Sequence, residues 1–185
     1  MMKKILLSLL ALTAASTIQA APADMAKSRI DVTFTQMSVP VDASFKRFSA
    51  DINYDPKATE KTSAIIIVDV GSFDLGDPEY NKEVLKPEWF NASQYSQATF
   101  KSSSVRAISA SQIEASGVLT IKGTTQNVVV PITVKADGKG WSFSGELPIK
   151  RNDFNIGEGE WRATDMVADE VKIRFAIITT TATTP

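Results

Sequence analysis

The sequence predicts an all-β protein, an antiparallel sandwich or barrel of about eight strands, with a short helical segment around residues 78–90 at one end. Two observations carry this prediction. Apolar and polar residues alternate in segment after segment, which is the period of a strand with one buried face. Short turn sequences separate these segments, as in antiparallel sandwiches and barrels. One long apolar excursion interrupts the pattern, and it is the expected helical segment.

The alternation is clearest at Ile30, Val32 and Phe34, and again at the end of the chain at Val171, Ile173 and Phe175. Pairs and quartets such as Gly123-Thr124 and Asp137-Gly138-Lys139-Gly140 mark tight hairpin turns. The expected strands cover residues 30–35, 48–54, 64–70, 99–105, 113–121, 128–134, 141–147 and 171–177.

The helical segment begins at Asp77-Pro78, where the aspartate can act as N-cap and proline suits the first helical position. Residues 79–85 can form about two turns before Lys86-Pro87 ends the helix. The segment carries too many apolar side chains to be exposed to solvent, so we expect it to cover one end of the barrel. These apolar residues are Tyr80, Val84, Leu85, Trp89 and Phe90.

Composition excludes several classes of chemistry. The 185 residues contain no cysteine and no histidine, so disulfides, Cys/His zinc sites and histidine-based catalytic triads are ruled out. The net charge is −1 with no basic run, which argues against nucleic acid as a partner, because phosphate binding needs clustered Lys and Arg.

Residues 1–20 have the pattern of a cleaved signal peptide. Lys3 and Lys4 precede an apolar stretch over 5–15 that is too short to span a bilayer, and Ile18-Gln19-Ala20 is a cleavage site. An uncleaved membrane anchor is the alternative. We therefore expect a periplasmic protein with one domain over residues 21–185.

Candidates for catalysis or metal binding are few. The densest acidic cluster, Glu158 and Glu160 with Asp165, Asp169 and Glu170, lacks the spacing of a calcium loop, so we predict no metal and no cofactor. An enzyme acting on a lipid would have to use Asp153 with Arg151 or Lys150. The preferred interpretation is that Arg151 and Asp153 pair or cap a turn.

The side chains at the inward positions of such a barrel would be large and apolar. If the interior is open, it suits a long hydrophobic ligand. Each buried methylene contributes about 0.8 kcal/mol, so a long hydrocarbon chain could bind without a metal. A filled interior would instead indicate a structural or partner-binding stress-response module. The residues predicted to face the lumen and bind the ligand are Phe34, Phe48, Ile66, Val68, Phe73, Leu85, Trp89, Phe90, Phe100, Leu119, Phe143, Phe154 and Phe175.

Three segments resemble the YceI-like family. Residues 84–102 (VLKPEWFNASQYSQATFKS) are similar to its helix-to-strand signature, residues 117–125 (GVLTIKGTT) to its central hairpin, and residues 151–157 (RNDFNIG) to its late R-x-D-F-x-I-G element. The order and spacing of the three also match. Val84 and Lys122 stand where family members often have histidine, so a head-group role for those histidines does not carry over.

The resemblance implies an extended lipocalin-like barrel that binds a polyisoprenoid, an isoprenoid quinone or a related lipid in the periplasm, as a carrier and not an enzyme. It also implies a functional link to a cytochrome b561-type membrane protein. A homodimer would cover the strand edges that such barrels leave open.

Overall fold

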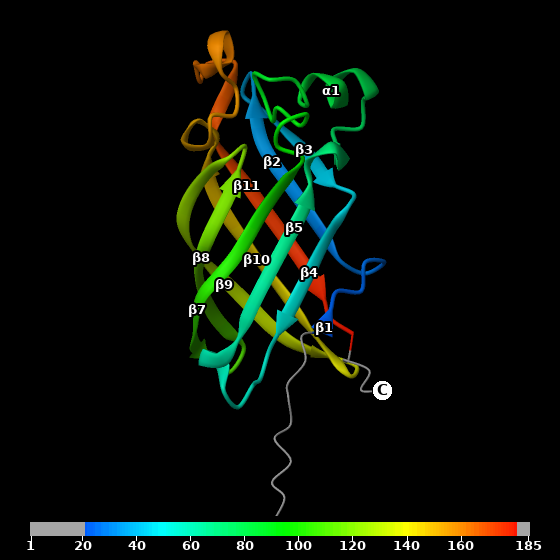
Figure 1. Ribbon diagram of the computed structural model, residues 1–185, viewed down its shortest axis with the longest axis vertical. Coiled ribbons are helices and arrows are strands. Elements are labelled where there is room, and N and C mark those ends of the chain that lie inside the picture. Colours follow the sequence, from blue (N-terminus) through cyan, green and yellow to red (C-terminus); the bar gives the residue numbers. More distant parts are fainter. Residues whose placement is uncertain (1–20, 181–185) are drawn as a thin grey trace, which may run out of the picture.

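The structure is a computed structural model that describes residues 21–180 (Figure 1). The expected signal peptide, residues 1–20, lies outside the described residues. Within residues 21–180, no helix is long and apolar enough to cross a membrane.

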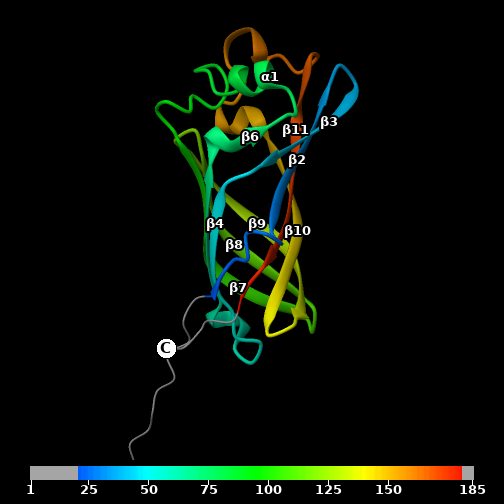
Figure 2. The same cartoon turned by 90° about the vertical axis from the view of Figure 1, so that its right-hand side faces the viewer.

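Eleven antiparallel strands form one sheet, in the order β1-β4-β5-β7-β8-β9-β10-β11-β2-β3-β6. The sheet curls around its own apolar face into a half-barrel of the lipocalin-like type (Figures 1 and 2). The strands are β1 (Ala21–Pro22), β2 (Arg29–Gln36), β3 (Val39–Phe45), β4 (Phe48–Asn53), β5 (Ser63–Asp69), β6 (Phe73–Asp74), β7 (Gln97–Ser109), β8 (Gln112–Ile121), β9 (Thr124–Asp137), β10 (Gly140–Lys150) and β11 (Val167–Ile178).

The all-β prediction is confirmed, but the count of about eight strands is too low. β1 and β6 have only two residues each, which is too short for any periodic pattern. β3 contains Pro40 and Asp42, both of which are unfavourable in strands. Nevertheless, Val39, Val41, Ala43 and Phe45 alternate with polar residues and Pro40, so this alternation could have revealed the strand.

Residues 23 and 24 join β4 to β11 across the seam of the curled sheet, at the end of the barrel where the described chain begins and ends. The backbone N–H of Ala23 donates to the carbonyl of Ala50 on β4 at 3.0 Å, and that of Asp24 donates to Ile178 on β11 at 2.7 Å. Farther along the seam, Ile30 of β2 packs in one buried cluster with Ala50 and Ile52 of β4. Backbone hydrogen bonds therefore close the seam at this end. Towards the capped end, the side chains of β2 and β4 pack across it.

The opposite end is covered by two irregular segments, seen at the top of Figures 1 and 2. The cap, residues 77–96, contains α1 (Pro78–Glu83), and the rim loop, residues 151–166, contains the 3₁₀ turns η3 (Arg151–Phe154) and η4 (Gly159–Arg162). The remaining 3₁₀ turns are η1 (Thr59–Lys61), at the uncapped end, and η2 (Val70–Ser72). The barrel therefore has an end closed by strands and hairpins and an end covered by the cap.

The start of α1 follows the expected chemistry. The Asp77 carboxylate accepts from the backbone N–H of Glu79 at 2.8 Å, and Pro78 occupies the first helical position. The helix ends at Glu83, earlier than residue 85, because the next backbone bonds link residues three apart, as from Leu85 to Lys82. Phe90 then packs against Phe45 and Phe73, with ring centroids 6.2 and 5.3 Å away.

Asp74 joins β6 to the cap, and we predict that this junction loosens in acid. Its carboxylate accepts from Asn81 Nδ2 at 3.0 Å and from the Gly76 N–H, and Lys46 Nζ lies 3.3 Å away. The hydrogen bond from Asn81, followed by the other two contacts, lowers the pKa of Asp74 below its ordinary value of 3.8. The stabilising contribution is therefore full above pH 3.8 and disappears as the pH falls through the lowered pKa.

Hydrogen exchange of residues 75–82, measured as the pH is lowered from 6 to 2.5, checks this prediction after correction for the intrinsic exchange rates. Protection is expected to fall in acid in the wild type and to be low at every pH in Asp74→Asn. Equal pH profiles for the two proteins would contradict it.

Candidate functional site

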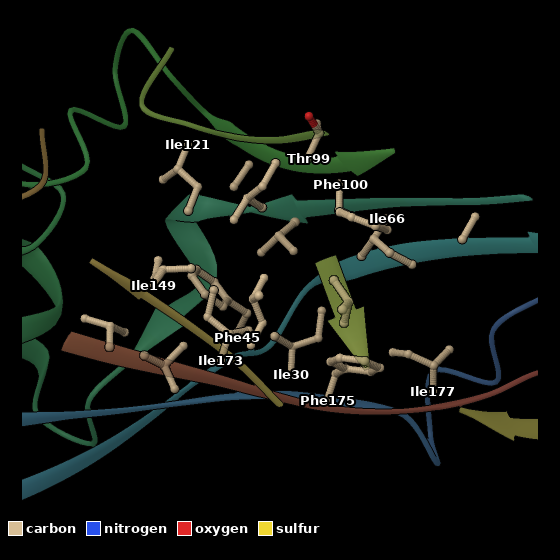
Figure 3. A pocket seen from close by; sticks show the side chains of 18 of the residues that line it. Ile30, Phe45, Ile66, Thr99, Phe100, Ile121, Ile149, Ile173, Phe175 and Ile177 are labelled. Carbon is tan, nitrogen blue, oxygen red and sulfur yellow. The ribbon is translucent and has the colours of Figure 1, made fainter. Parts of the chain in front are cut away.

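An elongated cavity of about 220 Å³ runs inside the barrel. Figure 3 shows side chains converging on it from facing strands, with Ile66 and Phe100 on one side and Ile173 and Phe175 on the other. Val167 and Ile177, which lie ten residues apart on β11, both line it. Because a strand rises about 3.3 Å per residue, the cavity follows roughly 30 Å of that strand. A cavity of this volume and length is narrow along its course.

The wall of the cavity is almost entirely apolar. Among the described residues, the only polar ones that line it are Thr62, Thr99 and Arg151. Figure 3 shows the hydroxyl of Thr99 turned away from the other labelled side chains. Within residues 21–180, no three acidic side chains are grouped so that they could hold a metal ion. The wall therefore offers apolar contact along its length and few groups for proton transfer.

Among the described residues, Arg151 is the one charged residue at the wall, and its donors bond to backbone carbonyls of the rim loop and of the start of β11. The side chain is 2% exposed. Its Nη1 donates to the carbonyl of Ile156 at 2.9 Å, while Nη2 donates to Ala163 and Val167 at 2.9 and 2.8 Å. Nε donates to Ala168 at 3.1 Å. Burial lowers the pKa of this guanidinium, and nearby Asp169 partly opposes the shift.

This geometry gives Arg151 a structural role, in line with the preferred interpretation, but with different partners. Arg151 donates to carbonyls of the rim loop and of the start of β11, and within the described chain Asp153 is exposed and forms no ion pair with it. The backbone carbonyl of Asp153 accepts from Gln126 Nε2 at 3.4 Å, and within the described residues no side-chain hydrogen bond links Asp153 to Arg151. The pair expected for a lipid-converting enzyme is therefore not assembled.

Comparison with known proteins identifies the family. Residues 22–179 match the YceI-like domain. The chain belongs to the YceI family. Among solved structures, BcnA of Burkholderia cenocepacia superposes with a TM-score of 0.83 at 46% identity, covering 85% of this chain and 99% of that one.

Two other comparisons extend this result. A UPF0312 protein of Vibrio cholerae is 31% identical over 118 residues, which cover 60% of this chain and 62% of the relative. The match thus spans less than two thirds of that relative's length. A polyisoprenoid-binding domain from Saccharophagus degradans, implicated in plant cell wall breakdown, superposes with a TM-score of 0.69 at 15% identity, covering 86% of this chain and 97% of that domain. At this identity the likeness shows the fold alone.

The three segments that resemble the YceI family meet at the capped end of the barrel. Residues 84–96 lie in the cap, residues 117–125 form the β8–β9 hairpin, and residues 151–157 begin the rim loop. The carbonyl of Glu88 accepts from the N–H of Gly157 at 2.9 Å and from that of Glu158 at 2.8 Å. Distant parts of the sequence thus build one end of the cavity.

Lys122, at the tip of the β8–β9 hairpin, fixes the rim loop to this end. Its side chain is 5% exposed, and Nζ donates to the carbonyl of Asn155 at 2.7 Å and to Glu158 Oε2 at 2.8 Å. The charge of this lysine is therefore already paired. The arrangement supports a positioning role for Lys122, with no free cation facing the cavity.

The structure brings ten of the thirteen predicted lumen residues to the cavity wall. Phe48 packs in the buried cluster around Ala50, while Leu85 and Phe154 pack in the cluster beneath the cap, and none of these three lines the cavity. Sequence reasoning missed Phe45, because residues 39–45 were not expected to form a strand. The ten at the wall are Phe34, Ile66, Val68, Phe73, Trp89, Phe90, Phe100, Leu119, Phe143 and Phe175.

Proposed function

We propose that this protein binds a long-chain amphipathic lipid, a polyisoprenoid or isoprenoid quinone, in the barrel cavity, and acts as a periplasmic carrier and not as an enzyme. The observation that carries the proposal is the long, narrow cavity whose wall is apolar apart from three residues. The expected signal peptide over residues 1–20 supports the periplasmic location. The polyisoprenoid-binding domain with the same fold supports the class of ligand.

Apolar contact supplies the energy of binding. An apolar cavity of about 150 Å³ holds one benzene, so a cavity of about 220 Å³ takes in about nine carbons. Nine buried carbons contribute roughly 7 kcal/mol at about 0.8 kcal/mol each, which exceeds the lower end of an association cost of about 4 to 15 kcal/mol. A longer chain gains further binding energy as the lining side chains move apart around it.

Filling the cavity is expected to abolish lipid binding. Ala115 lies on β8, is 2% exposed and lines the cavity, so Ala115→Phe places a ring inside it. Ala107, on the neighbouring β7, is exposed, so Ala107→Phe is the matched control. We expect Ala115→Phe to fold, with an overpacking cost of about 1–3 kcal/mol, and to lose at least tenfold in affinity for a fluorescent isoprenoid quinone analogue.

Circular dichroism and urea unfolding establish that both variants fold. Wild-type affinity in a folded Ala115→Phe protein would contradict the proposal. Native mass spectrometry of the wild type, purified without detergent, adds a direct observation, because a co-purified long-chain species is expected. Its absence, together with no binding of added lipid, would favour the partner-binding stress-response module.

Three finer features of the proposal rest on the resemblance and on general barrel physics. They are the periplasmic carrier role, a functional link to a cytochrome b561-type membrane protein, and a homodimer that covers exposed strand edges. Sedimentation at micromolar concentration tests the dimer. Lipid transfer between donor and acceptor vesicles tests the carrier role, and turnover of the bound lipid would instead indicate an enzyme.

A further inference from the structure

Apolar side chains are exposed at the tip of the β2–β3 hairpin, which lies at the capped end of the barrel, at the top of Figure 2. Met37 is 64% exposed, the highest fraction of any large hydrophobic residue among residues 21–180, and Val39 is 60% exposed. Met166 is also exposed and lies beside them, since its carbonyl accepts from the Met37 N–H at 2.8 Å. Single exposed apolar residues are common, but three grouped at one tip indicate an interaction surface.

The backbone of this turn gives no reason for a methionine. Gln36 pairs with Val39, so Met37 and Ser38 form a two-residue hairpin loop. Both have positive φ angles, 49° and 65°, a conformation in which asparagine and glycine are favoured and a long apolar side chain is uncommon. Local structure therefore favours a small polar residue at position 37, and the methionine side chain needs an explanation outside the turn.

The tip carries no charge. Residues 35–41 (TQMSVPV) contain no lysine, arginine, aspartate or glutamate. The first charge along β3 is that of Asp42, and it is paired with Arg174 at 3.1 Å. The tip therefore has no basic group to attract the phosphates of an anionic surface, and its chemistry matches an apolar layer instead.

The tip is apolar on both faces of the hairpin. Val39 shares a face with Val41, which pairs with Phe34 of the cavity wall, because residues two apart on a strand face the same side. The Met37–Met166 hydrogen bond continues the β2–β11 ladder, and the next residue, Val167, lines the cavity. Met166 therefore faces away from the cavity. A protein surface covers one face of a hairpin, whereas a bilayer surrounds an inserted tip on both.

We propose that the β2–β3 tip docks on an uncharged lipid surface and inserts Met37, Val39 and Met166 into its apolar layer. A carrier that takes its ligand from a bilayer has to work at such a surface, so the inference rests in part on the proposed function and adds the partner surface. Val39 also continues, through Val41 and Phe34, the apolar face that forms the cavity wall. Insertion by apolar contact, without basic residues, gives docking that salt does not weaken.

The test places a probe at the tip. The chain contains no cysteine, so a single introduced cysteine can be labelled alone. Met37→Cys and the control Met25→Cys each receive an environment-sensitive NBD fluorophore and are mixed with phosphatidylcholine vesicles. Met25 is also exposed but follows β1, at the opposite end of the barrel. The tip label is expected to brighten, to shift to shorter wavelength and to be quenched by brominated lipid, whereas the control label should stay unchanged.

A second variant removes the apolar side chain without harming the turn. Asparagine suits the left-handed conformation at position 37, so Met37→Asn should fold at least as well as the wild type. Vesicle flotation is expected to give a partition coefficient about tenfold lower than that of the wild type, the effect of one inserted methionine side chain. Docking that requires phosphatidylglycerol in the vesicles, or that salt abolishes, would overturn the apolar insertion.

The outcomes separate docking from ligand binding. Without vesicles, Met37→Asn is expected to bind a fluorescent isoprenoid quinone analogue as tightly as the wild type, and a weaker affinity would place the tip in the binding site and overturn its docking role. A tip label that stays in water, while the wild type binds the analogue, overturns the docking surface and leaves lipid binding standing. A tip label that enters vesicles, in a protein that binds no analogue, supports the docking surface and overturns the lipid-binding proposal.

Discussion

Replacing Arg151 with methionine is expected to lower the free energy of unfolding by about 3–5 kcal/mol, because the change removes the donors that hold the rim loop. The carbonyls of Ile156, Ala163 and Val167 would lose their short contacts with the guanidinium, and that of Ala168 would lose its bond to Nε. Methionine fills similar space but donates no hydrogen bond. Urea unfolding, followed by far-ultraviolet circular dichroism, measures the loss.

Two further variants show whether geometry or charge is responsible. Lys150→Met removes a positive charge at the neighbouring exposed position, and its effect should stay within about 0.5 kcal/mol. Arg151→Lys keeps the charge but replaces the planar fork with a single ammonium, so it should recover less than half of the loss. A loss below about 1 kcal/mol in Arg151→Met would contradict the structural role assigned to this residue.

The role of Arg151 shows where prediction from sequence ends. Its neighbourhood in the chain pointed to Asp153, a residue with an opposite charge two positions away. Its actual partners are backbone carbonyls up to 17 residues distant, and a carbonyl is the same in every residue type. No pattern of side chains could have identified them.

The strands were easier to predict because a strand with one buried face shows an alternation of apolar and polar residues in the sequence. Residues 113–121 alternate and form β8 (Gln112–Ile121), in which every odd residue from Ile113 to Ile121 is buried. This alternation brings Leu119 to the cavity wall. It cannot separate a residue that lines a cavity from one that packs beside it. Phe48, predicted to face the lumen, is partly buried and packs against the cluster around Ala50.

Replacing Gly117 with alanine is expected to narrow the cavity and reduce ligand affinity at least tenfold. Gly117 lies on the buried face of β8, between Ala115 and Leu119, both of which line the cavity. A Cβ there would lie 2.5 Å from the carbonyl oxygen of Lys101 and 2.7 Å from the Phe100 ring. The carbonyl belongs to β7, and its position is fixed because β7 is paired with β8. The Phe100 ring must therefore move, and we expect it to move towards the lumen.

The same variant should lose about 1–3 kcal/mol of unfolding free energy, which is the usual cost of overpacking. Adding Phe100→Leu to Gly117→Ala removes the displaced ring, and lipid affinity is expected to recover in part. Ser116→Ala, on the opposite face of β8, is the control and should bind as the wild type does. Unchanged affinity in a folded Gly117→Ala protein would show that the Phe100 ring does not border the occupied part of the cavity. The close approach of Phe175 to Gly145, whose added Cβ would lie 2.7 Å from that ring, gives an independent site for the same test.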